Sequence, residues 1–171
     1  MEPLDVALLI LRLGVGLTFA AHGAQKLFGW WGGPGFGRWR SAMDRMGFRP
    51  VGLFAAVSSV NEVAGGLMLA LGVATPVVAA ALVAQTVVII VKVHLPNGFF
   101  VTKSGIEFAL NLATCELAIA LVGPGALSVD GAVGFVPSTT VRLVLLVLGA
   151  AAGFVALAVP RINARREAAA A

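Results

Sequence analysis

The sequence predicts an all-α integral membrane protein, built as a four-helix transmembrane bundle with a fifth transmembrane helix toward the C-terminus. Of the 171 residues, 59% are hydrophobic and only 12% are charged, and the mean hydropathy is +0.97. A water-soluble domain has about a quarter of its residues charged. The apolar residues form long runs without the alternation of a membrane β-barrel, so helices are favoured over strands. This composition excludes disordered, collagen-like, disulfide-rich and most soluble proteins.

Five apolar runs are candidates for the spanning helices. A helix that crosses a bilayer needs about 20 residues, because the hydrocarbon core is about 30 Å thick and each residue rises about 1.5 Å. The runs cover residues 6–28, 51–71, 76–94, 106–122 and 139–159. The fourth run is the shortest and the most polar. The first run is longer than the apolar part of a signal peptide and has no basic segment before it, so we expect a retained helix.

The connections between the runs predict how the chain is oriented in the membrane. Lysine and arginine are enriched in cytoplasmic loops. Segments 1–5, 72–75 and 123–138 contain neither residue, whereas the alternate segments are basic. The basic residues in or beside them are Arg38, Arg40, Arg45, Arg49, Lys92, Lys103, Arg161, Arg165 and Arg166. We therefore expect the N-terminus outside the plasma (inner) membrane, an odd number of spans, and a basic cytoplasmic tail over residues 160–171.

Turn-forming sequences fill the connections and leave no room for a second domain. Gly-Gly-Pro-Gly at 32–35, Leu-Pro-Asn-Gly at 95–98 and Gly-Pro-Gly at 123–125 all favour turns. We therefore expect a single membrane domain over residues 1–171.

Polar side chains inside the predicted spans identify the candidate site. A charged residue near the centre of such a helix costs about 2.5–3.5 kcal/mol, so it needs a partner, a wet cavity or a route to the interface. His22, Gln25 and Lys26 share one helix face because they are three and four residues apart. With the orientation above, the polar groups form a layer toward the cytoplasm with a branch toward the midplane. The candidate ligand-binding residues are His22, Gln25, Lys26, Asn61, Glu62, Lys92, His94, Glu107 and Asn111.

Equal numbers of cations and carboxylates in the spans suggest buried ion pairs without identifying them. The cations are Arg12, Lys26 and Lys92, and the carboxylates are Glu62, Glu107 and Glu116. Simpler interpretations stay open for single residues. The two lysines lie near helix ends, from which a side chain can extend to the headgroups, and His22 can act as an interhelical hydrogen-bond donor. Cys115 is expected to pack as a small side chain, and Trp30, Trp31 and Trp39 to form an interfacial aromatic belt.

The residues give little support for metal, hydrolase or nucleic-acid chemistry. No His–Glu pair has the three-residue spacing of di-iron helices, so we expect no metal. A nucleophile-elbow pattern is also lacking. The single cysteine, Cys115, excludes an intramolecular disulfide. Because the basic residues lie in short clusters between apolar runs, we expect no nucleic-acid partner and attribute them to membrane topology.

The order of the polar residues resembles that of DoxX-type membrane proteins. The resemblance rests on RLGVGLTFAAHGAQKLFGW at residues 12–30, NEVAGGL at 61–67, HLPNGFF at 94–100 and GIEFAL at 105–110. It covers about residues 8–130, and the helix at 139–159 departs from the usual four-helix unit. The resemblance implies a compact four-helix bundle in the inner membrane. It also implies a link to redox chemistry, because DoxD-type relatives are associated with thiosulfate:quinone oxidoreduction and DoxX members with oxidoreductase complexes that handle oxidative stress.

The leading functional hypothesis is a membrane subunit whose bundle encloses a polar pocket for a quinone-like or other small amphipathic ligand. His22 and Lys26 would donate hydrogen bonds to the ligand, and Glu62 and Glu107 would accept protons or hold the cations. Glu62 and His22 are therefore the catalytic candidates, and quinone is the suggested cofactor. Because the sequence shows no haem or flavin motif, electrons would come from a membrane or peripheral redox partner. A homo-oligomer is compatible with this hypothesis.

Two other functions stay open. One is a non-enzymatic scaffold or assembly subunit whose buried ion pairs only fix the helix register, which predicts a filled interior with every charge paired. The other is a small transporter for an anion or weak acid, which predicts a polar route that continues to the outside. An inverted repeat, common in transporters, is not visible.

Overall fold

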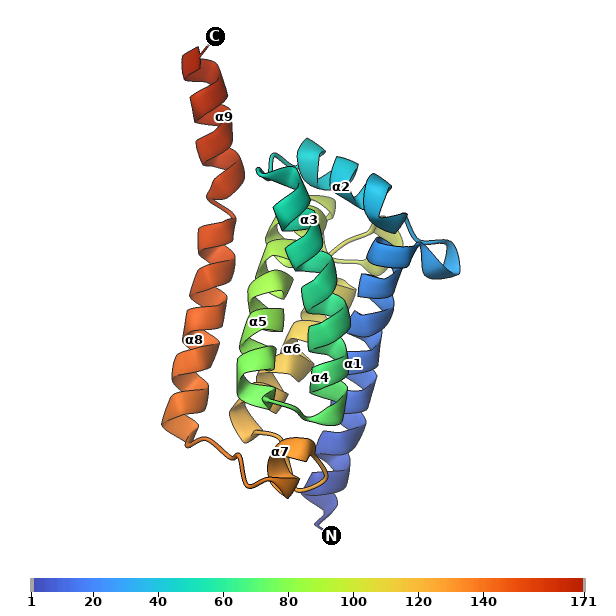
Figure 1. Cartoon of the computed structure of the whole chain (residues 1–171), viewed down its shortest axis with the longest axis vertical. Coiled ribbons are helices and arrows are strands. Elements are labelled where there is room, and N and C mark those ends of the chain that lie inside the picture. Colours follow the sequence, from blue (N-terminus) through green and yellow to red (C-terminus); the bar gives the residue numbers. More distant parts are fainter. Residues whose placement is uncertain (1, 171) are drawn as a thin grey trace.

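The computed structural model describes residues 2–170, without the side chains of Arg166, Glu167 and Ala170, and all regular elements in this range are helical. This confirms the all-α prediction, while the last residue of the expected tail, Ala171, lies outside the described residues. The main helices run side by side, and the two chain ends lie at opposite ends of the bundle (Figure 1). We call these the N-terminal end and the C-terminal end.

We call each stretch of the chain that runs along the bundle a pass. The first pass is α1, Pro3–Phe28. A proline in the first turn suits a helix start, because the N–H groups of that turn have no helical partner. The helix ends at Gly29, whose φ of 74° lets its N–H donate back to the Gln25 carbonyl. Its 26 residues are long and apolar enough to cross a membrane.

A short amphipathic helix, α2 (Gly35–Arg45), follows the turn η1 (Trp30–Gly32) and lies across the C-terminal end of the bundle (Figure 1). The glycine- and proline-rich sequence before it predicted only turns here. The helix forms because Trp39, Met43 and Met46 recur at intervals of four and three, so their apolar side chains share the face that meets the bundle. Arg38 and Arg40 are exposed and give this interfacial helix a basic outer side.

The second and third passes each contain a π-helical turn. The second runs through α3 (Val51–Val60), η2 (Asn61–Gly65) and α4 (Gly66–Leu71). The third runs through α5 (Thr75–Val88), η3 (Ile89–His94) and η4 (Leu95–Asn97). Both passes are long and apolar enough to cross a membrane. The π turns η2 and η3 lie within otherwise α-helical passes, and such turns are frequently found at functional sites.

The fourth pass, α6 (Glu107–Val122), is the short one. It follows the turn η5 (Val101–Lys103) and leads to α7 (Val129–Ala132) at the N-terminal end. Its 16 residues correspond to about 24 Å, less than the roughly 30 Å hydrocarbon core. The described residues therefore contain four helices that meet the length for a span, and α6 is not among them.

The fifth pass, α8 (Thr139–Ala156), packs along α5 and continues into α9 (Val159–Ala170) (Figure 1). Gly149 and Gly153 make this contact close, because a Cβ on either glycine would overlap the Ala80 or Ala84 carbonyl. α9 is attached to the loop after α2, where Asn163 Nδ2 donates to the Gly47 carbonyl at 2.9 Å. The additional helix is thus part of the bundle.

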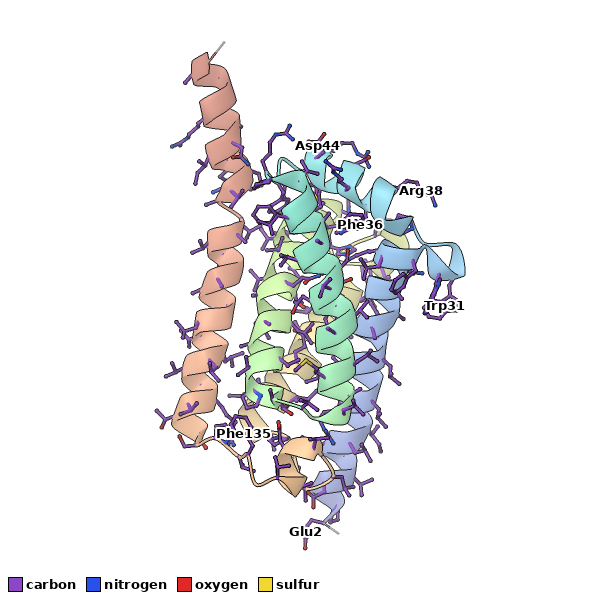
Figure 2. The ribbon with its side chains drawn as sticks, viewed as in Figure 1. Glu2, Trp31, Phe36, Arg38, Asp44 and Phe135 are labelled. Carbon is purple, nitrogen blue, oxygen red and sulfur yellow. The ribbon has the colours of Figure 1, made fainter. Side chains whose placement is uncertain are left out.

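The interior is small and apolar, and the outer faces are apolar too. The core is formed by α1, α4, α5 and α6, where the buried residues are Val15, Phe19, Leu69, Val78, Ala79, Leu82, Ile119 and Ala120. Outward-facing side chains such as Ile10, Val77 and Val147 are exposed. Figure 2 shows Trp31 and Phe36 near the C-terminal end and Phe135 near the other end. These apolar outer surfaces contact the lipid bilayer.

Arg12 occupies a separate polar cluster at the N-terminal end. It is fully buried and donates a hydrogen bond to the Leu127 carbonyl, within electrostatic reach of Asp130. Asp130 in turn accepts hydrogen bonds of 2.7 Å from the N–H groups of Ala74 and Thr75, which begin α5. The cluster therefore attaches α7 to the α4–α5 turn. The predicted set of spanning carboxylates did not include this partner of Arg12.

Candidate functional site

A cavity of about 420 Å³ opens inside the bundle below α2, where α1, η2, α5, η3 and α6 meet. Its polar lining comes from His22, Lys26, Arg45, Glu62, Thr86 and His94. Phe19, Phe108 and Leu112 are among its apolar walls. We call it the first cavity. Its size and its mostly apolar lining with a few convergent polar groups are those of a small-molecule site.

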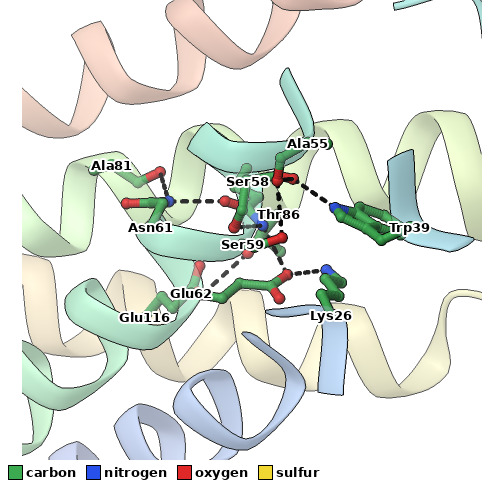
Figure 3. Close-up of polar contacts among 11 residues, drawn as sticks. Lys26, Trp39, Ala55, Ser58, Ser59, Asn61, Glu62, Ala81, Thr86 and Glu116 are labelled. Carbon is green, nitrogen blue, oxygen red and sulfur yellow. Dashed lines mark hydrogen bonds and ion pairs between the residues drawn. The ribbon is translucent and has the colours of Figure 1, made fainter. Parts of the chain in front are cut away.

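An ion pair between Lys26 and Glu62 is the centre of this site (Figure 3). The side chain of Glu62 is 2% exposed and that of Lys26 is 15% exposed, so the pair lies inside the bundle. α1 brings Lys26 to this place, and the π turn η2 brings Glu62. A buried charge is costly unless a partner of opposite sign is close, which explains why the two helices present these residues to each other.

Only one of the two Glu62 carboxylate oxygens has partners. Oε1 accepts hydrogen bonds from Lys26 and from Gln85 Nε2, the latter at 2.7 Å. Oε2 is buried and has no hydrogen-bond partner among the described residues. Most buried polar atoms in proteins are hydrogen-bonded, so an unpartnered carboxylate oxygen beside a cavity needs an explanation.

The amide side chains of Asn61 and Gln85 fix the position of Glu62, and Figure 3 shows the contacts of Asn61. Asn61 Nδ2 donates to Gln85 Oε1 at 2.9 Å, and Gln85 Nε2 also approaches the Ser58 carbonyl at 3.1 Å. The network thereby joins the second pass to the third. Because Gln85 is oriented by Asn61, its amide N–H rather than its carbonyl faces Glu62.

Trp39 connects α2 to the ion pair. Its indole N–H donates to Ser58 Oγ at 3.0 Å, and the Lys26 ammonium lies 4.4 Å from the centre of a Trp39 ring. The second contact is a cation–π interaction, strongest where water is excluded. Trp39 thus lies against the ion pair, whereas Trp30 and Trp31 are exposed as an aromatic belt requires.

A second buried carboxylate, that of Glu116, adjoins the first cavity through Thr86. Thr86 lines the cavity and its hydroxyl donates to Glu116 Oε1 at 3.0 Å (Figure 3). Glu116 is fully buried, and its Oε2 has no partner among the described residues. Thr86 therefore lies between Glu116 and the cavity.

The structure brings five of the nine predicted ligand-binding residues to the site. His22, Lys26, Glu62 and His94 line the first cavity, and Asn61 lies beside it in the network around Gln85. His22 is exposed, with its ring 5.9 Å from that of Phe108, and the described residues give it no carboxylate partner. His94 Nδ1 lies 2.7 Å from the Ser104 carbonyl, which fixes the ring. The binding roles of these residues stay predictions.

The other four predicted residues lie elsewhere. Lys92 is exposed, and the Asn111 amide donates to the Glu107 carbonyl of its own helix. Glu107 accepts a hydrogen bond of 2.9 Å from the Val101 N–H and so holds the loop before α6. Gln25 packs under the Gly33 turn. Within residues 2–170, none of the four lines the first cavity.

Sequence reasoning missed three residues of the site. Trp39 was assigned to the aromatic belt, and Thr86 has no signal of its own because threonine is common in apolar helices. Gln85 is a polar residue of the predicted run 76–94 that the set of candidate ligand-binding residues did not include. It lies in the last turn of α5, four residues before the π turn η3 begins at Ile89. From there its side chain reaches Glu62. The described residues contain no group of three or more His, Cys, Asp or Glu side chains that could hold a metal ion.

Helical passes with apolar outer faces, around a buried ion pair and a cavity, define a multi-pass α-helical membrane protein. The family follows from the chain's first three passes. The sequence profile of the DoxX family matches residues 7–95, so the chain belongs to the DoxX family. No curated protein and no solved structure matches the chain.

Proposed function

We propose that the first cavity binds a quinone-like or other small amphipathic molecule, and that the protein serves as a membrane subunit of an oxidoreductase complex. The observation that carries the proposal is the buried Glu62 Oε2, which has no partner among the described residues, on a side chain that lines a cavity of about 420 Å³. A ligand with an O–H group or a bridging water supplies the missing hydrogen bond. Satisfying such an atom is favourable by about 1–3 kcal/mol.

The lining gives each polar group a role toward a ligand with carbonyl or hydroxyl oxygens. Lys26 and His22 donate hydrogen bonds to a carbonyl oxygen, and Glu62 accepts a hydrogen bond from a hydroxyl. Quinone reduction takes up two protons, and the Thr86 hydroxyl gives Glu116 a route to the same cavity. Phe19, Phe108 and Leu112 offer apolar surface to a ring. These donors, acceptors and walls fit a quinone.

The cavity also favours ligand binding over a scaffold function. A scaffold needs only a filled interior in which each charge is paired. The ion pair instead borders an open cavity, and one carboxylate oxygen has no hydrogen-bond partner among the described residues. Neither feature is needed to fix the helix register. We therefore favour ligand binding, with a redox partner protein supplying the electrons.

Quenching of Trp39 fluorescence tests the proposal, because quinones quench nearby indoles and Trp39 lines the cavity. Replacing the exposed Trp30 and Trp31 by phenylalanine makes Trp39 the sole tryptophan. In nanodiscs, decylubiquinone should then quench saturably. The double variant Lys26→Met/Glu62→Leu removes both charges together, and it should weaken binding about tenfold or more, the equivalent of about 1.4 kcal/mol.

The matched control is Lys92→Met, which changes an exposed lysine outside the cavity. It should bind as the unmodified chain does. Quenching that rises without saturation, equally in all three proteins, would show that the quinone only dissolves in the lipid and would refute the proposal. In a purified complex with its redox partner, Glu62→Gln should abolish quinone-dependent turnover.

A further inference from the structure

A second cavity of about 330 Å³ lies on the other side of the Lys26–Trp39 contact. Both cavities are lined by Lys26, Trp39, Met46, Ile89 and Val93, so the same side chains separate and border them. The second cavity lies between α2, α3, α5 and α8, whereas the first extends toward α1 and α6. The two are therefore neighbouring compartments of one region.

The two compartments differ in chemistry. Glu62, His22 and His94 line only the first. The second is lined mainly by apolar side chains, including Met43, Phe48, Phe54 and Val88. Three of its polar residues are hydrogen-bonded. Trp39 donates to the Ser58 hydroxyl, Asn61 donates to the Gln85 side chain, and Gln85 donates to the Ser58 carbonyl. The first compartment thus offers unsatisfied polar groups, and the second offers apolar surface.

α8 supplies one wall of the second cavity. Ala152, Gly153 and Ala156 line it, and the close packing of Gly153 on Ala84 holds this wall in place. These residues lie outside the segment that matches the DoxX family. The helix that departs from the four-helix unit therefore completes this compartment.

We propose that the second cavity holds the apolar tail of the molecule whose polar head lies in the first cavity. The ligand class is then a head group that carries an isoprenoid or alkyl chain, such as a tailed quinone, rather than a compact tail-less molecule. This inference rests on the proposed function, since it assumes that the first cavity binds the head.

The tail compartment serves to orient the ligand. A chain that already lies in lipid gains little free energy by moving into an apolar protein cavity, because both surroundings are apolar. A chain held there nevertheless directs its head group toward Lys26 and Glu62. Met43 and Met46 suit this role, because methionine adapts its shape to irregular apolar chains.

Photo-crosslinking with two probes tests the inference. One probe is a decyl-tailed benzoquinone with a diazirine on the ring, and the other carries the diazirine at the end of the tail. After illumination in nanodiscs, mass spectrometry maps the labelled peptides, with unlabelled decylubiquinone as competitor. The ring probe should label the peptides of His22, Phe108 and Leu112, and the tail probe those of Met43, Phe54 and Ala156.

Two variants on α8 make the test specific. Ala156→Phe places a ring in the second cavity and should reduce competed labelling by the tail probe at least fivefold, while the ring probe labels as before. Ala151→Phe is the matched control, because Ala151 is exposed and lines neither cavity within the described residues; it should change nothing.

The outcomes separate the two proposals. If the ring probe labels the first cavity while the tail probe labels lipid-facing positions such as Val147, or if Ala156→Phe leaves the tail labelling unchanged, the inference fails and the proposed function stands. If neither probe gives labelling that the competitor suppresses, the proposed function itself fails, and the inference with it.

Discussion

Lys26 and Glu62 show how a costly residue in an apolar helix determines its surroundings. Glu62 has 1% of its surface exposed, and its charge is balanced by a lysine from another helix, an amide from a third and the ring of Trp39 beside that lysine. Such a pair contributes little net free energy, because desolvation offsets the attraction. Removing one partner is different, since it leaves a buried charge alone.

The first prediction follows from this asymmetry. Lys26→Met should lower the free energy of unfolding by about 3 kcal/mol, because it leaves the Glu62 carboxylate without a cation. The double variant Lys26→Met/Glu62→Leu should recover most of that loss. Reversible unfolding in SDS, followed by circular dichroism, measures both. The account is contradicted if Lys26→Met costs no more than the exposed Lys92→Met.

The second prediction concerns Asp130 at the N-terminal end. Asp130→Asn replaces one acceptor of the Ala74 and Thr75 N–H groups by an amide N–H and removes the negative charge near Arg12. Stability should fall by about 1–3 kcal/mol in the same SDS titration. Asp44→Asn is the control, because its ion pair with Arg49 is exposed and should contribute under about 1 kcal/mol. Equal losses for the two variants would refute this role of Asp130.

At the residue scale the sequence indicates which groups need partners, but not who the partners are. The cost of charge in lipid singled out Lys26, Glu62 and Arg12. The opposite charge within electrostatic reach of Arg12, however, is that of Asp130, which lies in a segment predicted as a connection, where an acid is unremarkable. Glu107 and Asn111 are polar residues in an apolar run, as Glu62 is, but they form hydrogen bonds with backbone groups close to them in the sequence. The hydrogen bond of the Glu107 carboxylate depends on the conformation of the loop before α6, which hydropathy does not predict.

At the element scale, close helix contacts depend on glycine. Gly16 and Gly66 bring α1 and α4 together, because a Cβ on either would overlap the backbone of the other helix. Gly149 and Gly153 do the same for α5 and α8. Small residues at such contacts are the usual way in which membrane helices associate.

The third prediction tests the attachment of α8. Gly149→Val should lower stability by about 1–3 kcal/mol, because its side chain overlaps the Ala80 carbonyl and forces the helices apart. Ala151→Val on the exposed side of the same helix should be neutral. SDS unfolding compares the two. Were both variants as stable as the unmodified chain, α8 would not be packed on α5 as described.

The long helices are predictable from hydropathy, whereas two features of the elements are not. α2 begins in a glycine-rich segment that favours turns, and only its packing on the bundle completes the helix. The π turns η2 and η3 have no composition signal, because tertiary contacts such as Gln85 to Glu62 select them. The shortness of α6, in contrast, agrees with the run predicted at 106–122, and Gly123 ends the helix.

At the scale of the whole molecule, the two chain ends lie at opposite ends of the bundle (Figure 1). The distribution of lysine and arginine leads us to propose that the end with α2 and α9 faces the cytoplasm of the plasma membrane. Arg38 and Arg40 on α2, which are both exposed, then lie at the inner headgroups. In this orientation the first cavity lies near the cytoplasmic side.

The fourth prediction tests that orientation. In a Cys115→Ala background, Val136→Cys in the α7–α8 connection should react with a membrane-impermeant maleimide on intact cells. Ala168→Cys in α9 should react only after lysis. Both positions are exposed, so access alone does not distinguish them. The reverse pattern, or labelling of both from one side, would contradict an N-terminus outside and a C-terminus inside.

The central claim is that this bundle retains a small lipid-soluble molecule at Lys26 and Glu62, and native mass spectrometry after gentle detergent extraction tests it most directly. The unmodified chain should release a defined adduct in the mass range of a quinone or similar amphiphile. The folded double variant Lys26→Met/Glu62→Leu should lack it, while Lys92→Met should keep it. The same bound species, or none, in all three proteins would contradict the account.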